Sequence, residues 1–209
     1  MPAPQPPTIL VVDTNCFIRL LFSPLRPVLG ATFAGYKLMT LLELAVECGP
    51  GTSVTKRNPW LLDEAVQQEL ASNCLMLRKP KSTKVAEFTR YFRSQGNSLL
   101  RKHCLDKSLD KVRELSTADA KALAAAQVLQ GALATDEWPL GFVAERASDV
   151  EQVFTSVDVL HLMEGDGKIA GAQRVEVVSS WVQHGEKLPL NWRDRYRALF
   201  GEEPPNAQS

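Results

Sequence analysis

The chain has 209 residues, of which 44% are hydrophobic, so it is long enough to form one domain with a buried core and some elaboration. Its 24 basic and 24 acidic residues cancel, which argues against a protein that mainly coats nucleic acid but not against an enzyme that contacts a strand locally. Aromatic residues make up 7% of the chain, too few for an extended base-stacking surface.

Cysteine spacing and apolar patterning indicate the compartment. The cysteines are far apart and form no C-x-x-C pair, so a zinc site is not expected, and we predict four free thiols in a reducing environment: Cys16, Cys48, Cys74 and Cys104. The Pro-rich, uncharged start, Met1 to Pro7, lacks the pattern of a secretory signal. No apolar run is long enough to cross a bilayer. The sequence therefore predicts a cytoplasmic protein with no membrane partner.

The first predicted element is a strand at Thr8–Val12, a continuous apolar and β-branched run typical of a strand buried on both faces. It ends at the polar residues Asp13 to Asn15, where α/β folds place ligand sites. A helical pattern follows around Phe33–Glu47, and a loop is predicted from Gly49 to Pro59.

The middle of the chain is predicted to be largely helical. Trp60–Leu62 is interpreted as a short strand, and Asp63 as the N-cap of a helix that runs to Ala71. A long helical region is expected from about Thr83 to Glu114, broken near Gly96.

The region from Met76 to Leu115 is strongly basic, with eleven basic and four acidic residues. One interpretation is a solvated helix surface. The other is an electrostatic shelf that holds phosphates beside an acidic pocket. The sequence leaves both open.

The next elements repeat the pattern of a helix followed by a strand. Ser116 to Asp119 resembles a capping box at the start of an Ala-rich helix, which is expected to end at Gly131. Ala132–Thr135 is predicted to be a strand, closed by two acidic residues, with another helix beginning near Pro139.

Further elements are predicted near Val153–Thr155 (strand), Val157–Met163 (helix) and Ala170–Gln183 (helix). Alternating strands and helices predict an α/β fold, a three-layer α/β/α sandwich around a mainly parallel sheet. We expect one domain over residues 8–163, a helical C-terminal extension over 164–201 and a disordered tail over 202–209.

Three carboxylates occupy positions that suggest a metal site. Asp13 and Asp136 each follow a predicted strand, and Asp119 lies in the first turn of the Ala-rich helix. Because the carboxyl ends of parallel strands converge, we expect Asp13 and Asp136 to lie close together, and a cation would relieve their repulsion. Such oxygen ligands suit Mg²⁺ or Mn²⁺. Taken singly, each residue also has a structural interpretation: Asp119 as a helix cap, Asp13 and Asp136 as turn residues.

In these motifs the sequence resembles the PIN-domain nuclease family. Ile9–Asn15 resembles the opening motif of the family and Asp63–Leu70 its second. Ser116–Ala120 and Ala134–Glu137 resemble the third and the fourth. The resemblance implies a PIN-like fold and a metal-binding, catalytic set of four acids: Asp13, Glu69, Asp119 and Asp136. It also implies supporting roles for Asn15, Thr135 and Glu137. Asp63 and Glu64 remain rivals of Glu69 for the second acid.

The resemblance also implies a function. A member of this family would use Mg²⁺ or Mn²⁺ to hydrolyse phosphodiester bonds, here most simply in single-stranded RNA, with DNA left open. Compact PIN-like proteins resemble the toxins of toxin–antitoxin pairs, so an antitoxin partner and a homodimer are further expectations.

Other functions fit the sequence less well or remain as alternatives. A phosphatase of the haloacid-dehalogenase type would need a second aspartate two residues after Asp13, where this chain has Asn15. A nucleotide-binding protein is disfavoured because neither glycine-rich phosphate motif is present. A catalytically inactive PIN-like scaffold or interaction module stays open.

Overall fold

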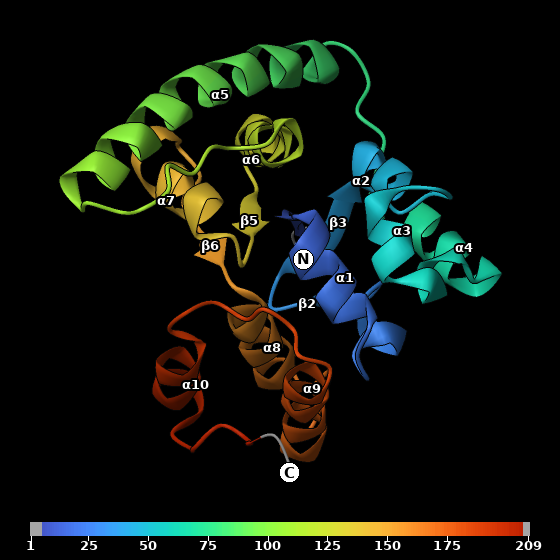
Figure 1. Ribbon diagram of the computed structural model, residues 1–209. Helices are drawn as coiled ribbons and strands as arrows, with labels where there is room; N and C mark the ends of the chain where they lie inside the picture. Colours follow the sequence, from blue (N-terminus) through green and yellow to red (C-terminus); the bar gives the residue numbers. More distant parts are fainter. Residues whose placement is uncertain (1–5, 207–209) are drawn as a thin grey trace, which may run out of the picture.

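A six-stranded, mainly parallel sheet forms the centre of the molecule (Figure 1). In the computed structural model, which describes residues 6–206, the strands are β1 (Thr8–Val12), β2 (Thr32–Phe33), β3 (Tyr36–Leu41), β4 (Cys74–Leu75), β5 (Ala132–Ala134) and β6 (Val153–Phe154). They lie in the order β2-β3-β1-β5-β6, and β4 pairs with β3 off this path. The short pair β2–β3 is antiparallel, and the pairs of β1 with β3 and β5 are parallel.

Strand β1 is buried on both faces, as predicted, because it lies between β3 and β5. Leu10 and Val12 point into one apolar core, and Val11 points into a second core on the opposite face. This alternation follows from the two-residue period of a strand. Two cores separated by one sheet require helices on both sides.

Ten α-helices and two short 3₁₀ turns are found within residues 6–206. The helices are α1 (Thr14–Leu21), α2 (Leu42–Glu47), α3 (Ser53–Arg57), α4 (Glu64–Ser72), α5 (Lys81–Asp106), α6 (Thr117–Leu129), α7 (Trp138–Ala147), α8 (Ser156–Gly165), α9 (Gly171–Gln183) and α10 (Trp192–Phe200). The 3₁₀ turns are η1 (Arg26–Val28) and η2 (Pro59–Leu62).

Helices cover both faces of the sheet. Helices α5, α6 and α7 share the core that contains Val11, whereas α1, α8, α9 and α10 share the core that contains Leu10 (Figure 1). The predicted mixed α/β architecture with a mainly parallel sheet is confirmed, and the helices on both faces agree with three layers. None of the described helices combines the length and the apolar character needed to cross a membrane.

The segment Phe33–Glu47 was predicted to be one helix, and this is wrong. Ala34 and Gly35 have positive φ angles of 45° and 79° and form the tight turn between β2 and β3. Strand β3 then pairs with β1 and with β4, and only the last residues of the segment form a helix, α2. The apolar residues fit either period, and the pairing partners on both sides of β3 decide in favour of a strand.

Two local predictions between β3 and α4 are also wrong. Trp60–Leu62 belongs to the 3₁₀ turn η2 and not to a strand, and the predicted loop before it contains α3. Thr52 caps α3, since its side chain accepts a hydrogen bond from the backbone N–H of Thr55. The cap and the proline at the start of η2 favour helical turns over an extended chain.

The predicted break near Gly96 does not occur, because α5 is continuous and ends at Asp106, before the predicted Glu114. Gly96 is the point where α5 approaches α7. A Cβ atom there would lie 2.9 Å from Cγ1 of Val143 and 3.0 Å from Cδ1 of Leu115. The glycine therefore serves close packing of two helices and not a kink.

The C-terminal helices belong to the same core as β1. Trp181 of α9 is buried and donates a hydrogen bond from its indole N–H to the carbonyl of Arg19 on α1. Tyr196 of α10 is fully buried. These two aromatic side chains therefore pack in the core.

The predicted tail begins at residue 202, and its described part, residues 202–206, contacts the C-terminal helices. Glu202 forms an ion pair with Arg174, and Glu203 accepts two hydrogen bonds from Arg197. These charges hold the segment against α9 and α10. Residues 207–209, like residues 1–5 of the Pro-rich start, lie outside the described residues.

The four cysteines are free thiols, as predicted, and three of them, Cys16, Cys48 and Cys104, are buried. Burial raises the pKa of Cys48 to about 11, so this thiol behaves as a small apolar side chain.

Candidate functional site

Asp13 lies at the junction of β1 and α1, at the carboxyl edge of the sheet. Its side chain caps α1 by accepting a hydrogen bond from the backbone N–H of Cys16 at 2.7 Å. The register that pairs Val12 with Ala134 continues through a hydrogen bond from the Asp13 N–H to the Ala134 carbonyl. This places Thr135 next to Asp13, and the Thr135 hydroxyl donates to the Asp13 carboxylate. The predicted convergence of the ends of β1 and β5 is confirmed.

The Asp13 carboxyl is 3% exposed, and its environment disfavours the charged form. Burial is the largest effect and raises the pKa of Asp13 to about 7, against the hydrogen bonds from Thr135 and Cys16, which lower it. The nearby carboxylates of Asp119 and Glu137 raise it further. A buried acid beside two other acids is an arrangement that a bound cation would stabilise.

Asp119 lies in the first turn of α6, at the position predicted for it. Its carboxylate accepts a hydrogen bond from the Ser116 N–H, and the Ser116 hydroxyl accepts one from the Asp119 N–H, which completes a capping box. Asp119 and Asp13 also line one small cavity of about 20 Å³, together with Glu43. Such a volume accommodates one water-sized occupant. Asp119 is thus both a helix cap and a neighbour of Asp13.

Asp136 has a different position from the one expected. It accepts a hydrogen bond from the Arg19 guanidinium and another from the Ser156 backbone N–H at 2.9 Å. The Arg19 and Asp136 side chains are 4% and 3% exposed, so they form a buried ion pair. Both carboxylate oxygens of Asp136 already have partners. The residue therefore secures the β5 end against α1 and α8. It lines the large cleft with Asn15 and Glu137 and is absent from the small cavity that Asp13 lines.

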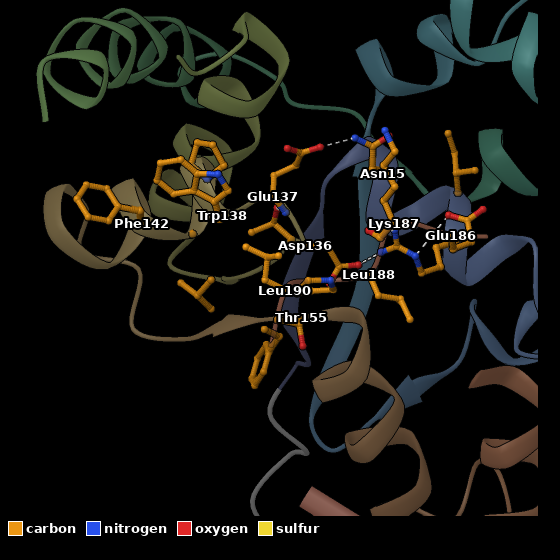
Figure 2. A pocket seen from close by; sticks show the side chains of 18 of the residues that line it. Asn15, Asp136, Glu137, Trp138, Phe142, Thr155, Glu186, Lys187, Leu188 and Leu190 are labelled. Carbon is orange, nitrogen blue, oxygen red and sulfur yellow. Dashed lines mark hydrogen bonds and ion pairs between the residues drawn. The ribbon is translucent and has the colours of Figure 1, made fainter. Parts of the chain in front are cut away.

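Glu137, expected only in a supporting role, lies on the Asp13 side. Its carboxylate accepts a hydrogen bond from the Asn15 amide at 2.7 Å (Figure 2). Thr135 holds the turn, because its hydroxyl accepts a hydrogen bond from the Glu137 N–H at 3.0 Å. The predicted supporting residues Asn15, Thr135 and Glu137 are therefore linked to one another and to Asp13.

The three candidates for the second acid lie elsewhere on α4 and its cap. Glu69 forms an ion pair with Arg26 at 2.7 Å, Asp63 caps α4, and the Glu64 carboxylate accepts a hydrogen bond from Gln68. None of them lines the small cavity with Asp13 or the large cleft beside Asn15.

Two acids that the sequence analysis missed lie on α2, directly after β3. Glu43 lines the small cavity and forms an ion pair with Lys121. Glu47 accepts a hydrogen bond at 2.8 Å from the hydroxyl of Thr14, the residue that follows Asp13. Because β3 is the parallel neighbour of β1, the argument from converging strand ends would have found both acids. Because Phe33–Glu47 was predicted to be helical, the end of strand β3 was not recognised and these two acids were not considered.

A large open cleft begins at Asn15 and Glu137. It has a volume of about 1000 Å³ and is bounded by the turn after β5, by α7 and by the loop between α9 and α10 (Figure 2). Arg19 fixes that loop by donating a hydrogen bond to the Lys187 carbonyl at 2.9 Å. Of the acids near Asp13, Glu137 lines this cleft, which is large enough for a ligand of several groups, whereas Asp13 and Asp119 line the small cavity.

The donor set fits a hard divalent cation with few protein ligands. Among residues 6–206, no three His, Cys, Asp or Glu side chains are arranged as a preformed metal cage. Mg²⁺ commonly binds through one or two carboxylates and completes its shell with water and substrate phosphate. Asp13 and Asp119, which share the small cavity, supply such a pair, and Glu137 adds an oxygen donor at the cleft.

Comparisons with protein-family models, with curated proteins and with solved structures gave no match.

Proposed function

We propose that the protein is a divalent-metal-dependent endonuclease with a PIN-like fold that hydrolyses phosphodiester bonds in single-stranded RNA. The observation that carries this proposal is Asp13, a buried carboxyl with a pKa of about 7 beside Asp119 and Glu137, at the carboxyl edge of a mainly parallel sheet. A carboxyl buried beside other carboxylates destabilises the folded protein. A cation-binding role at this position would explain why the chain keeps such an arrangement.

The chain's own residues would act as holders and positioners. Asp13 and Asp119 would hold the ion, and Asp13 is fixed by the Cys16 N–H and the Thr135 hydroxyl. Asn15 orients Glu137 at the edge of the cleft. When bound, Mg²⁺ or Mn²⁺ supplies charge neutralisation at the phosphate and a water of lowered pKa. This set keeps Asp13 and Asp119 of the predicted acids and replaces Glu69 and Asp136 by Glu137.

The test is cleavage of labelled single-stranded RNA in Mg²⁺ or Mn²⁺ by the wild type, Asp13→Asn and Asp119→Asn. Asparagine keeps the shape and the hydrogen-bond acceptor of each side chain, including the cap of α6, and removes the charge. We expect metal-dependent cutting by the wild type and loss of about a hundred-fold or more in each variant, because each removes a charged metal ligand. Cutting that persists in chelator, or in both variants, would refute the proposal.

A second candidate function is a catalytically inactive PIN-like scaffold. The buried ion pair of Arg19 with Asp136 favours it, because this acid is committed to the structure. Calorimetry with Mn²⁺ separates the two functions. Heat of binding that is lost in Asp13→Asn supports the nuclease, whereas no binding and no cutting of RNA or DNA supports the scaffold.

The biological role proposed is that of a toxin held inactive by an antitoxin protein, with a homodimer as the assembly. Expression of the protein alone should then arrest bacterial growth, and co-expression of a neighbouring antitoxin gene should restore it. The Asp13→Asn variant is the matched control for toxicity. Growth arrest that persists in this variant would exclude nuclease activity as its cause, and unaffected growth with wild type would favour a housekeeping RNA-processing role.

A further inference from the structure

We propose that one base of the substrate strand stacks on Trp138 in the large cleft, above Gly141, and that the strand's phosphates are held by basic side chains that line the same cleft. The inference deepens the proposed function and rests on it for the identity of the ligand. It adds a positioning residue and a strand path to the acids already described.

Trp138 is more exposed to solvent than an aromatic residue of the core. It is 39% exposed, whereas Trp181 in the core is 1% exposed. It directly follows Glu137 in the chain and lines the same cleft (Figure 2). A base stacked on this indole would therefore lie next to Glu137, the acid of the candidate site that lines this cleft.

Two other rings lie close to the indole of Trp138. Phe142 lies edge-on to it, with ring centroids 6.2 Å apart, and His103 of α5 lies 6.0 Å away. The guanidinium of Arg146 covers Phe142 at 4.0 Å from the ring centroid. These contacts reduce the freedom of the ring and so prepare it for stacking.

The face of α7 that lines the cleft is shaped by a glycine. Leu140, Val143 and Ala144 are buried against the sheet side, which turns Trp138 and Gly141 toward the cleft. A Cβ atom built on Gly141 would have no heavy atom within 4 Å. Glycine inside a helix costs about 1 kcal/mol relative to alanine, so packing does not account for its presence here. The open space beside Trp138 is what Gly141 provides.

Cations from separate parts of the chain meet around this space. Three of the basic side chains that line the cleft come from different segments. Arg57 is the last residue of α3, Arg113 lies in the segment before α6, and Lys187 lies in the loop between α9 and α10. Within the described part of the chain, none of the three has a carboxylate within 4.0 Å. Such cations, each free to meet a phosphate, suit a polyanionic strand. Of the basic residues between Met76 and Leu115, only Arg113 lines the cleft.

The stacking surface selects a single strand. A base in a duplex has both faces covered by its neighbours, whereas an unpaired base offers a free face to an aromatic ring. One exposed tryptophan supplies one such contact, in keeping with the low aromatic content of the chain. The ligand class is thus a single-stranded nucleic acid with at least one unpaired base next to the bond that is cut.

The experiment measures binding of a fluorescently labelled single-stranded RNA by anisotropy in chelator, so that cutting cannot contribute. We expect Trp138→Ala to weaken binding by about ten-fold or more, the usual effect of losing one base–aromatic stack, and Trp138→Phe to retain most of the affinity. Gly141→Leu fills the open space and should weaken binding similarly. Gly141→Ala is the matched control, because a methyl group there leaves the stacking space open.

Four further comparisons test the specificity of the contact. An oligonucleotide with one abasic position should bind the wild type more weakly, while Trp138→Ala should show a much smaller difference between intact and abasic strands. Arg113→Gln should weaken binding of all sequences and lower the salt dependence by about one phosphate contact. A DNA strand of the same sequence shows whether the 2′-hydroxyl matters, and duplex RNA should not respond to Trp138→Ala.

The outcomes separate this inference from the proposed function. Dissociation constants within about two-fold of wild type for both Trp138→Ala and Gly141→Leu would overturn the strand path even if the protein cuts RNA. Binding that follows the expected pattern without any metal-dependent cutting would support the strand path and overturn the nuclease. Circular dichroism of each variant verifies that α7 remains folded.

Discussion

The Arg19 guanidinium donates a hydrogen bond to the Asp136 carboxylate, and both side chains are almost completely buried. Removing one member of a buried pair leaves an uncompensated charge, which typically costs 3–5 kcal/mol. We therefore expect Arg19→Met to lower the free energy of unfolding by about 4 kcal/mol in urea. The double variant Arg19→Met/Asp136→Leu should recover much of this loss, because it also removes the buried carboxylate, and Glu186, the other partner of Arg19, is 26% exposed.

The exposed pair of Arg101 and Glu114 is the control for this prediction. Its side chains are 63% and 56% exposed, so Arg101→Met should change the stability by about 0–1 kcal/mol. Equal effects of Arg19→Met and Arg101→Met would show that the Arg19 pair is not buried in solution.

The stability of the metal-free protein should fall as the pH rises from about 4 to 7 because of Asp13. Its pKa is raised to about 7 in the folded state, so the folded state holds this proton in a window where the unfolded chain has released it. In that window the unfolded state binds fewer protons than the folded state, so the free energy of unfolding decreases as the pH rises. At about 1.4 kcal/mol per pKa unit, the total decrease approaches 4 kcal/mol once Asp13 is ionised. Urea unfolding in chelator over this pH range measures it.

Asp13→Asn should remove that pH dependence and make the metal-free protein more stable than wild type above pH 7. Asp194→Asn is the control, because the Asp194 side chain is 82% exposed. Addition of Mn²⁺ at pH 8 should stabilise the wild type, as a ligand bound only by the folded state does, and should leave Asp13→Asn unchanged. A wild-type stability that is flat or increasing with pH would contradict the buried-acid environment.

Alanine substitutions at Gly131 and Gly141 should have different effects on stability, because Gly131 is closely packed and Gly141 faces open space. A Cβ atom at Gly131 would lie 2.3 Å from the backbone carbonyl oxygen of Ile9 in β1, so Gly131→Ala should destabilise by about 3 kcal/mol or more. Gly141→Ala should be neutral or stabilise by up to about 1 kcal/mol. Thermal unfolding of the two variants measures the contrast, and a Gly131→Ala variant as stable as wild type would contradict the close approach of Gly131 to Ile9.

Substitutions of Glu137, Glu69 and Asp136 should affect RNA cleavage and stability in different ways. Glu137→Gln should reduce RNA cleavage by about ten-fold or more with little change in stability, because Glu137 faces the cleft. Glu69→Gln should leave cleavage unchanged, since Glu69 pairs with Arg26 outside the cleft. Asp136→Asn should lower stability as well as activity. Cleavage assays paired with urea unfolding distinguish these patterns, and loss of activity in Glu69→Gln without loss of stability would restore the second acid inferred from the family resemblance.

Several elements were predictable because their signals are local. The apolar run of β1, the polar residues after it and the capping box of Ser116 with Asp119 act over a few residues, and all are found as predicted. The Asp63 cap of α4 belongs to the same class. The strand β3 was missed, because Tyr36–Leu41 becomes a strand only through its pairing with β1 and β4.

The sequence by itself determined that acids would gather at the carboxyl edge of a parallel sheet, since strand ends and helix starts place Asp13 and Asp119 there. The tertiary structure decided which of the other acids join them. Successive side chains at a strand end point in different directions, so Glu137 meets Asn15 while Asp136 turns to Arg19, more than a hundred residues away in the chain. The partner of a buried charge is determined by which residues pack next to it in the tertiary structure, and no local sequence pattern specifies that partner.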